Sequence, residues 1–227
     1  MNAPVTPPKT AHDCVLVTGF EPFDGEAVNP SAQLALRLQG ELVLPGVRVE
    51  AAVLPCVFDA ALDALAGHID RLRPRLVLCC GQAGGRSALS LERVAINLDD
   101  ARIPDNAGAQ PIDRPVQASG PAAYFTTLPV KRMAQALRSA GLPAEVSYTA
   151  GTFVCNHVFY GLMHLAQQRP WLRQGGFLHV PYLPEQAAHH PHAASMALDT
   201  MTTGLRLALQ AALQAGEDLH VSEGTIC

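Results

Sequence analysis

The residues whose chemistry stands out begin with a cysteine at the predicted start of a helix. In segment 149–157, TAGTFVCNH, a strand ends, a glycine permits a tight turn, and Cys155 opens the next helix. A thiol at a helix N-terminus lies beside unpaired backbone N–H groups at the positive end of the dipole, which lowers its pKa and favours the thiolate. The same N–H groups can hold a developing oxyanion. This segment predicts a nucleophile, and the alternative is a core cysteine packed with Phe159 and Leu162.

A reactive cysteine needs a histidine that holds its proton and later protonates the leaving amine. His179 lies at the end of the last predicted strand, in segment 176–181 (GFLHVP), and parallel strands can place their carboxyl ends side by side. We therefore predict His179 as the partner of Cys155, with a hydrogen-bonded structural histidine as the alternative. His157 follows Cys155 by two residues and points to another helix face, so we interpret it as structural or supporting.

Neither the remaining histidines nor the remaining cysteines predict a metal site. The chain has no CxxC pair, and the histidines around Pro191 have no carboxylates at ligand spacing, which favours a solvated loop. These histidines are His189, His190 and His192. The other cysteines lie in apolar strands, at a strand end or at the chain end, and are expected to be structural or terminal: Cys14, Cys79, Cys80, Cys56 and Cys227.

A third residue normally orients the histidine ring. The candidates are Glu92 and the pair Asp99 and Asp100, and sequence alone does not choose among them, because most such carboxylates are exposed or pair with an arginine such as Arg93. The glycine cluster 81–85 lacks the GK[ST] ending of a phosphate loop. It predicts a close approach of the backbone to a small ligand, or only a turn.

The elements that must position these residues alternate between strand and helix. Apolar runs predict strands over 14–18, 47–54, 76–80, 91–98, 146–149 and 176–180, and helical spacing predicts helices over 31–38, 58–72, 130–140, 156–168 and after Pro191. Residues 99–120 form a long irregular segment, which is typical of a functional loop. We predict one α/β domain over 1–227, a three-layer α/β/α fold with a mostly parallel twisted sheet. Residues 1–12 are expected to be a flexible extension and 214–227 a tail.

The composition excludes several classes of protein. The chain has 227 residues, a formal net charge of −4 and a pI near 6.1, so it lacks the basic surface that nucleic acid or an anionic membrane requires. No window approaches the roughly 18 apolar residues of a membrane span. The first ten residues lack the features of a secretory signal. We therefore expect a cytoplasmic protein with its cysteines as thiols.

Taken together, these segments resemble the pyroglutamyl-peptidase I family, also called pyrrolidone-carboxylate peptidases. The motifs occur in the family's order between about Val15 and about Thr203. They are GFEPF (19–23), VNPS (28–31), GQAGGR (81–86), ERVAIN (92–97), ARIPDN (101–106), SYTAGTFVCNHVFYG (147–161) and HVPY (179–182).

The resemblance implies a cytosolic cysteine exopeptidase that removes an N-terminal pyroglutamyl residue from peptides, with no metal or cofactor. It implies Cys155 as nucleophile, His179 as general base and acid, and Glu92 as the residue that orients the imidazole. Arg102 matches a family arginine near the catalytic centre, with an expected role in supporting the oxyanion or Glu92. The resemblance also implies a homo-oligomer, since family members commonly form tetramers. The implied substrate pocket comprises Phe20, Phe23, Asn29, Gln82, Ile103, Phe153 and Val154.

Pyroglutamate is a small neutral lactam, and its chemistry fits these residues. Phenyl rings can cover its flat faces, while Asn29 and the Gln82 segment can meet its polar edge. A pocket without a carboxylate would leave an ordinary N-terminal ammonium unpaired and so reject it. Core packing is the alternative for Phe20 and Phe23. Asp24 stands where the family commonly has a glycine, which is expected to stiffen the loop or add charge there.

Two other classes of function remain open at this point. A nucleoside or phosphate enzyme on a similar sheet would act independently of Cys155. A non-catalytic pyroglutamate-binding or small-ligand-binding protein would bind pyroglutamate without turnover.

Overall fold

Strands and helices alternate along the chain in the computed structural model, which describes residues 14–214 and 216–225. The strands are β1 (Cys14–Phe20), β2 (Leu42–Leu44), β3 (Val47–Leu54), β4 (Leu76–Gln82), β5 (Leu89–Glu92), β6 (Val94–Ile96), β7 (Ala123–Phe125), β8 (Ala144–Ser147) and β9 (Gln174–Val180). The helices are α1 (Pro30–Arg37), α2 (Ala60–Leu72), α3 (Val130–Ser139), α4 (Val154–Gln168), α5 (Pro184–Ala187) and α6 (Leu198–Leu213). The predicted N-terminal extension 1–12 and Cys227 lie outside the described residues.

The main sheet is parallel at its centre. Its order is β2-β3-β1-β4-β9-β5-β8. Strands β3, β1, β4 and β9 run parallel, whereas β2 and the pair β5 and β8 run in the opposite direction. The central strands are nearly continuous apolar runs, as expected for strands that are buried on both faces.

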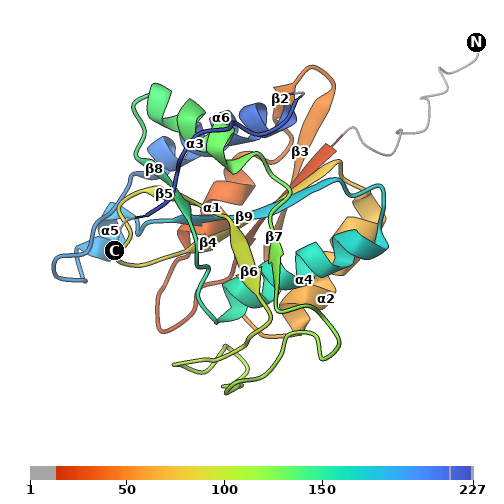
Figure 1. Cartoon of the computed structure of the whole chain (residues 1–227). Helices are drawn as coiled ribbons and strands as arrows, with labels where there is room; N and C mark the ends of the chain where they lie inside the picture. Colours follow the sequence, from red (N-terminus) through yellow and green to blue (C-terminus); the bar gives the residue numbers. More distant parts are fainter. Residues whose placement is uncertain (1–13, 215, 226–227) are drawn as a thin grey trace, which may run out of the picture.

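Helices cover both faces of this sheet, which gives three layers (Figure 1). Helices α1, α3 and α6 pack on one face, around Leu34, Met133 and Leu205. Helices α2 and α4 pack on the other face, around Leu65 and Phe159. This arrangement confirms the predicted α/β/α fold.

The predicted strand 91–98 is wrong as a single element. Strand β5 ends at Glu92, and after Arg93 the chain continues as β6, which pairs with β7 in a separate two-stranded sheet beside α4. The guanidinium of Arg93 lies over the Phe125 ring and near Asp218, while Asn156 binds the backbone of Ile96. The apolar pattern does not reveal such a change of partner, because it continues through the break.

Other differences concern element ends and short elements. Helix α4 begins at Val154, two residues earlier than predicted, so Cys155 lies within its first turn. Elements β2, β7 and α5 were not predicted, because three or four residues show no periodicity.

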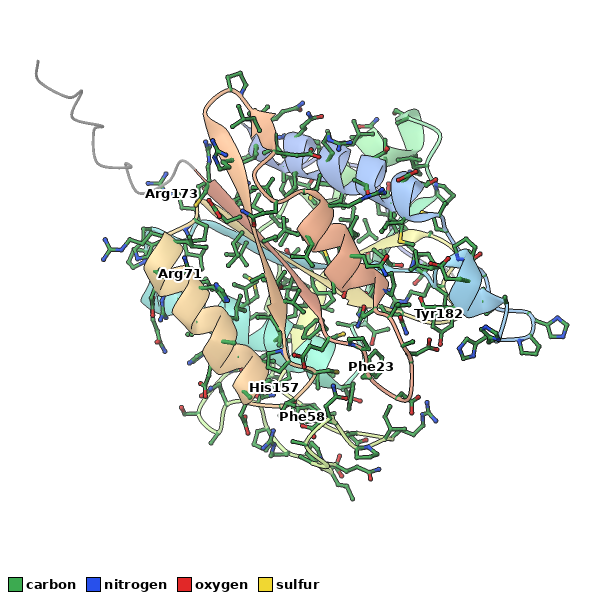
Figure 2. The ribbon with its side chains drawn as sticks, turned by 180° about the vertical axis from the view of Figure 1, so that it is seen from behind. Phe23, Phe58, Arg71, His157, Arg173 and Tyr182 are labelled. Carbon is green, nitrogen blue, oxygen red and sulfur yellow. The ribbon has the colours of Figure 1, made fainter. Side chains whose placement is uncertain are left out.

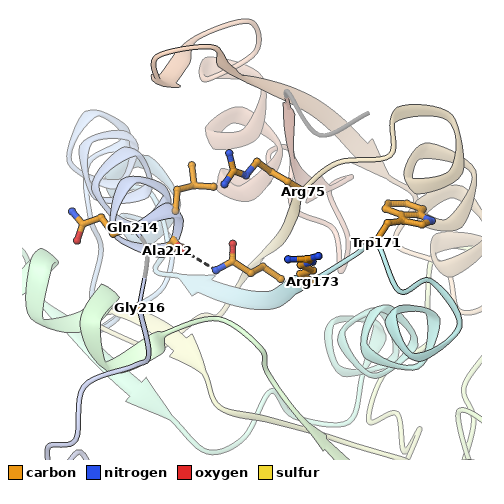
Figure 3. Close-up of a pocket in the computed structure, with 8 residues that line it drawn as sticks. Arg75, Trp171, Arg173, Ala212, Gln214 and Gly216 are labelled. Carbon is orange, nitrogen blue, oxygen red and sulfur yellow. Dashed lines mark hydrogen bonds between the residues drawn. The ribbon is translucent and has the colours of Figure 1, made fainter. Parts of the chain in front are cut away.

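A cavity of about 660 Å³ opens at the amino ends of β4 and β9 (Figure 3). Its lining includes Arg75, Trp171, Arg173 and Gln174. Gln174 is the first residue of β9, whereas His179 is close to the last, so this cavity lies at the sheet edge opposite to the predicted site. Among the described helices, none is long and apolar enough to cross a membrane.

Candidate active site

The sulfur of Cys155 lies against β4 at the level of His179. Gly81 in β4 pairs with His179 in β9. A Cβ atom at Gly81 would lie only 2.7 Å from the Cys155 sulfur and 2.9 Å from the ring of Phe177. The ring of Phe177 in turn lies 4.8 Å from that of His179, centroid to centroid. The missing side chain at Gly81 therefore makes room for the thiol beside the histidine.

Glu92 holds His179 from the other side. Nδ1–H of His179 donates to Oε1 of Glu92 at 2.7 Å, and Glu92 is fully buried. Of the three acidic candidates, Glu92 is therefore the one that contacts this ring. Nδ1 is occupied by this bond, which leaves Nε2 as the nitrogen that can exchange a proton.

The strands bring these residues together differently from our expectation. Strand β8, which precedes Cys155, is not adjacent to β9, because β5 lies between them and both β5 and β8 run antiparallel to β9. The connection 148–153 carries the chain back, and α4 packs across β9 and β4 with its first turn over Gly81. His179 and Gln82 do lie at the carboxyl ends of parallel strands, where sites in such sheets form.

Burial controls the protonation of both catalytic candidates. It raises the pKa of the Cys155 thiol well above its usual value; Cys56 and Glu92 act in the same direction, and the cation of Arg86 opposes them. Burial lowers the pKa of His179, against the effect of the Glu92 carboxylate. The expected lowering of the thiol pKa by the helix N-terminus is therefore wrong in direction, because desolvation outweighs it. The free site favours a thiol beside a neutral imidazole.

Access separates Cys155 from three of the other described cysteines. Cys56, Cys79 and Cys80 are buried, and burial raises the pKa of both Cys56 and Cys79 to about 12. Cys155 is partly exposed, and so is Cys14, but Cys14 is the first residue of β1 and lies at the sheet edge opposite to His179. Only a thiol that a substrate can reach is able to act as nucleophile, so the three buried cysteines have the structural role that we predicted.

The arginine that contacts Glu92 is Arg86, which sequence reasoning left without a role. Its Nη1 donates to Glu92 Oε1 at 2.7 Å. Arg102 is exposed and forms no hydrogen bond or ion pair within the described residues. The expected support of Glu92 by Arg102 is therefore absent from this part of the chain, and its oxyanion role stays a prediction. The signal for Arg86 was its place at the end of the glycine-rich motif.

Aromatic rings line the approach to Cys155. Phe153, the residue at the N-cap of α4, lies 6.0 Å from Phe23 and 5.3 Å from Phe58, centroid to centroid. Phe23 and Phe153 are half-buried, which suits pocket walls. Figure 2 shows Phe23 and Phe58 at one end of the molecule and Arg173 at the other. Phe58 is 4% exposed and supports the Phe153 ring from the core, a role that its place at a helix start without a motif did not indicate.

The other three apolar residues of the predicted pocket differ from one another in burial. Phe20 is 2% exposed and packs on Phe177, and Val154, the first residue of α4, is fully buried in the core. Ile103, in contrast, is half-buried on the loop 99–121. Phe20 and Val154 are thus core residues, which was the alternative stated for Phe20, while Ile103 keeps exposed surface.

The side-chain amides of the predicted pocket residues Asn29 and Gln82 form hydrogen bonds within the protein. Asn29 caps α1, accepting from Ser31 N at 3.0 Å, and donates to Glu21 O at 3.1 Å. Oε1 of Gln82 accepts from Gln186 at 2.9 Å. Because side chains alternate along a strand and Gly81 faces Cys155, the side chain of Gln82 lies on the opposite face. Contact of Gln82 with a ligand in the pocket would therefore use its backbone.

His157 is structural in its contacts, as we interpreted it. It is fully buried, with Nδ1 3.0 Å from Asp99 Oδ2 and Nε2 accepting from Asp59 N at 3.2 Å. Arg114 completes this network by donating to Asp99 at 2.8 Å. The ring of His157 lies beside that of Phe58, as Figure 2 shows. The network fixes the base of the loop 99–121 against α4.

The histidine-rich loop is partly tied to the pocket side of the molecule. Nε2 of His190 lies 2.6 Å from Glu26, and its ring stacks on Tyr182. The side chains of His189 and His192 are exposed and form no hydrogen bond or ion pair within the described chain, as a solvated loop predicts. Within residues 14–214 and 216–225, no group of three His, Cys, Asp or Glu side chains is placed to hold a metal ion.

A family model and curated relatives both match most of the chain. The family model described as pyroglutamyl peptidase matches residues 13–215. A pyrrolidone-carboxylate peptidase of Cupriavidus taiwanensis is 58% identical over 93% of this chain and 98% of its own length, and one of Yersinia pestis is 55% identical over the same shares.

Solved structures show the same fold. Pyroglutamyl peptidase I of Bacillus amyloliquefaciens superposes with a TM-score of 0.87 at 46% identity, covering 91% of this chain and 99% of that one. A mutant pyrrolidone carboxyl peptidase of Pyrococcus furiosus gives 0.85 at 38% identity, covering 88% and 98%. On these matches and the arrangement of Cys155, His179 and Glu92, the chain belongs to the pyroglutamyl peptidase family.

Proposed function

We propose that this pyroglutamyl peptidase hydrolyses the bond after an N-terminal pyroglutamyl residue with Cys155 as nucleophile, His179 as general base and acid, and Glu92 as the orienting residue. The observation that carries the assignment is the position of the Cys155 sulfur against Gly81, whose strand partner is the Glu92-bound His179.

The first step is a proton transfer between neutral groups. Since burial raises the pKa of Cys155 and lowers that of His179, Nε2 of His179 takes the thiol proton as the sulfur attacks the pyroglutamyl carbonyl carbon. Glu92 stabilises the imidazolium that forms. His179 then gives the proton to the departing amine, the C–N bond breaks, and a thioester remains on Cys155. Water, deprotonated by His179, then attacks the thioester carbon, the C–S bond breaks, and His179 returns the proton to the Cys155 sulfur as pyroglutamate leaves.

The oxyanion would form at the first turn of α4. Phe153, at the N-cap, supplies no side-chain acceptor for the helix amides, and the first amide recorded in a helical bond is that of His157, to Phe153 O. The preceding amides surround Cys155 at the positive end of the helix, where they favour a developing negative charge. We propose Arg102 as an additional support of this charge from the loop 99–121.

The pocket favours an uncharged group. The rings of Phe23 and Phe153 offer faces for a flat lactam, together with Ile103. The buried carboxylate of Glu92 is already paired with Arg86 and His179, so it does not offer a partner for a substrate ammonium. Peptides with an N-terminal pyroglutamate are therefore the substrate class that fits.

The test is turnover of a chromogenic pyroglutamyl amide by reduced protein and by Cys155→Ser. We expect the substitution to reduce kcat by at least about 10³-fold, and mass spectrometry of quenched wild-type reactions to show a pyroglutamyl adduct on the peptide that contains Cys155. Cys80→Ser is the control, because that buried thiol is expected to be dispensable for turnover. Undiminished turnover in Cys155→Ser would exclude the cysteine mechanism, and binding without turnover in the wild type would favour a binding protein.

We further propose a cytoplasmic location and assembly as a homo-oligomer, with the tetramer of the family as the expected state. A mechanism that depends on a reduced Cys155 supports a reducing compartment. Light scattering coupled to gel filtration measures the assembly, and a monomer at micromolar concentration would contradict it. Fractionation of cells tests the location.

A further inference from the structure

Arg86 connects the catalytic carboxylate to the turn that precedes the nucleophile. Its Nη1 donates to Glu92 Oε1 at 2.7 Å, and its Nη2 donates to the carbonyl oxygen of Thr149 at 2.8 Å. Thr149 begins the turn that leads through Gly151 into α4 and Cys155. One planar guanidinium therefore holds two segments that must keep a fixed separation for catalysis.

The charge of Arg86 is also needed at this position. Glu92 is fully buried, and a buried carboxylate requires an opposite charge. His179 does not supply it in the free site, because burial keeps that ring neutral near pH 7. The single ion pair that Glu92 forms with an arginine or lysine among the described residues is with Arg86.

The hydrogen bonds of Glu92 increase its dependence on Arg86. Oε1 accepts from both Arg86 and His179, while Oε2 is buried without a hydrogen-bond partner within the described chain. The carboxylate thus has no second set of donors that could hold it in place after the loss of Arg86. A small rotation of Glu92 would move its bond to His179 as well.

We propose that Arg86 is a positioning residue of the reaction, which acts through Glu92 on His179 and through the Thr149 carbonyl on the turn before Cys155. This inference rests on the proposed function of these three residues. The side chain of Arg86 is 24% exposed, and its hydrogen bonds within the described residues go to Glu92 and Thr149 rather than to the sulfur or the imidazole.

Two substitutions separate its charge from its geometry. Arg86→Gln removes the charge, and we expect kcat to fall about 10- to 100-fold with KM nearly unchanged. Arg86→Lys keeps the charge but not the two-pronged contact, so we expect a partial recovery of kcat. Arg173→Gln, an exposed arginine at the opposite edge of the sheet, is the matched control and should have wild-type kinetics.

The pH dependence of kcat/KM distinguishes this role of Arg86 from a purely structural one, which would leave the pH profile unchanged. The charged or titratable groups around His179 are Glu92 from β5, Arg86 from the loop between β4 and β5, and Cys155 from α4. The cation of Arg86 lowers the pKa of His179. We therefore expect the acid limb of kcat/KM to move to higher pH in Arg86→Gln and to stay near the wild-type position in Arg86→Lys.

A double substitution tests the route of action. If Arg86 acts mainly through Glu92, Arg86→Gln should add less than about threefold to the loss already caused by Glu92→Gln. The proposal would be overturned if folded Arg86→Gln had wild-type kcat, or if its acid limb did not move or moved to lower pH. Fully additive losses in the double variant would also overturn it. If Arg86→Gln does not fold, Arg86→Lys decides, and wild-type kcat in that variant would overturn it. Absence of turnover in the wild type would instead contradict the proposed function.

Discussion

Gly81 shows how a single missing side chain shapes the site. It pairs with His179 across β4 and β9, and the sulfur of Cys155 lies so close that a Cβ at this position would be only 2.7 Å from it. The sequence signal was a glycine cluster that predicted close approach of the backbone to a small ligand or only a turn. In the structure, the group that approaches Gly81 is the nucleophile itself.

Gly81→Ala should therefore displace the nucleophile without unfolding the protein. The new methyl group would lie 2.7 Å from the Cys155 sulfur, and a shift of about 1 Å costs about 10²-fold in kcat/KM. Gly67→Ala in α2 is the control, since nothing lies within 4 Å of its Cβ position. That change should leave activity intact and stabilise the helix by about 1 kcal/mol. Wild-type kcat/KM in Gly81→Ala would contradict the placement of the sulfur.

The pH dependence of the reaction is also decided by single residues. His179 must be neutral to accept the thiol proton, and its pKa lies below the ordinary value. The acid limb of kcat/KM should therefore lie below about pH 6.5. Activity is present above this lowered pKa and is lost as pH falls through it.

Glu92→Gln should reduce activity and shift that limb. The carboxylate raises the pKa of His179 against burial, so its removal should move the acid limb to still lower pH. We expect kcat/KM to fall by about 10² to 10⁴, because the imidazole loses its orienting acceptor. Glu185→Gln, on an exposed turn of α5, serves as control. An unchanged rate and limb in Glu92→Gln would refute the orienting role.

At the scale of elements, α4 does more than present Cys155. The next residue, Asn156, is fully buried and donates to Ile96 O at 2.8 Å and to Leu98 O at 3.0 Å. It also accepts from Ile96 N at 3.0 Å. Together with the contact of His157 to Asp99, these bonds fix the start of the loop 99–121 to the helix of the nucleophile. Figure 1 shows this yellow-green loop on the same side of the molecule as the start of α4.

Asn156→Ala should loosen this loop. Three hydrogen bonds between this buried side chain and the backbone of Ile96 and Leu98 are lost, and we expect the free energy of unfolding to fall by about 1–3 kcal/mol in urea denaturation. KM should rise more than kcat falls, because the loop carries Ile103, and limited proteolysis should cut within 99–121 faster. Gln168→Ala, at the exposed end of α4, should change none of these. Equal proteolysis of the two variants would show that Asn156 does not anchor the loop.

The loop that carries Phe23 illustrates how one residue type fits an element. Asp24 has a φ of +54°, in the left-handed region where glycine carries no steric penalty. This explains why a glycine is suited to the position and why aspartate, which tolerates that region better than most residues, stands there. The expected stiffening of the loop stays a prediction.

At the scale of the whole molecule, the C-terminal segment 216–225 lies beyond the residues that match the family model and still packs on the domain. Asp218 accepts from the backbone N–H groups of Lys131 and Arg132 at 3.2 and 2.9 Å. Pro129, at the N-cap of α3, has no side-chain acceptor, so Asp218 caps that helix from a distant part of the chain. The predicted tail after residue 213 is thus, over these residues, in contact with α3.

Asp218→Ala should lower the free energy of unfolding by about 1 kcal/mol, the usual contribution of a helix cap. Turnover at 25 °C should not change, because the segment does not touch the catalytic residues. Glu217→Ala is the matched control, since this exposed side chain forms no hydrogen bond or ion pair within the described residues and its backbone oxygen, which accepts from Arg132, is kept. Equal urea midpoints for the two variants would show that the cap contributes nothing.

The sequence by itself determined the layers of the fold and the small set of candidate groups. Continuous apolar runs and helical spacing are local properties, so they identified the central strands, the helices and the position of Cys155 near a helix start. The motif order pointed to Glu92 and His179 among many acids and histidines. These features depend on residues that are close together in the chain.

Only the tertiary structure decided which distant groups meet. Four features depend on such contacts. They are the antiparallel direction of β5, the contact of Arg86 rather than Arg102 with Glu92, the placement of Gln82 away from Cys155, and the cap that Asp218 forms on α3. The direction of the Cys155 pKa belongs to the same group, because desolvation depends on all the neighbours that fold around the thiol. The local sequence pattern indicates which groups are available for chemistry, whereas tertiary packing determines the distances between them and their protonation.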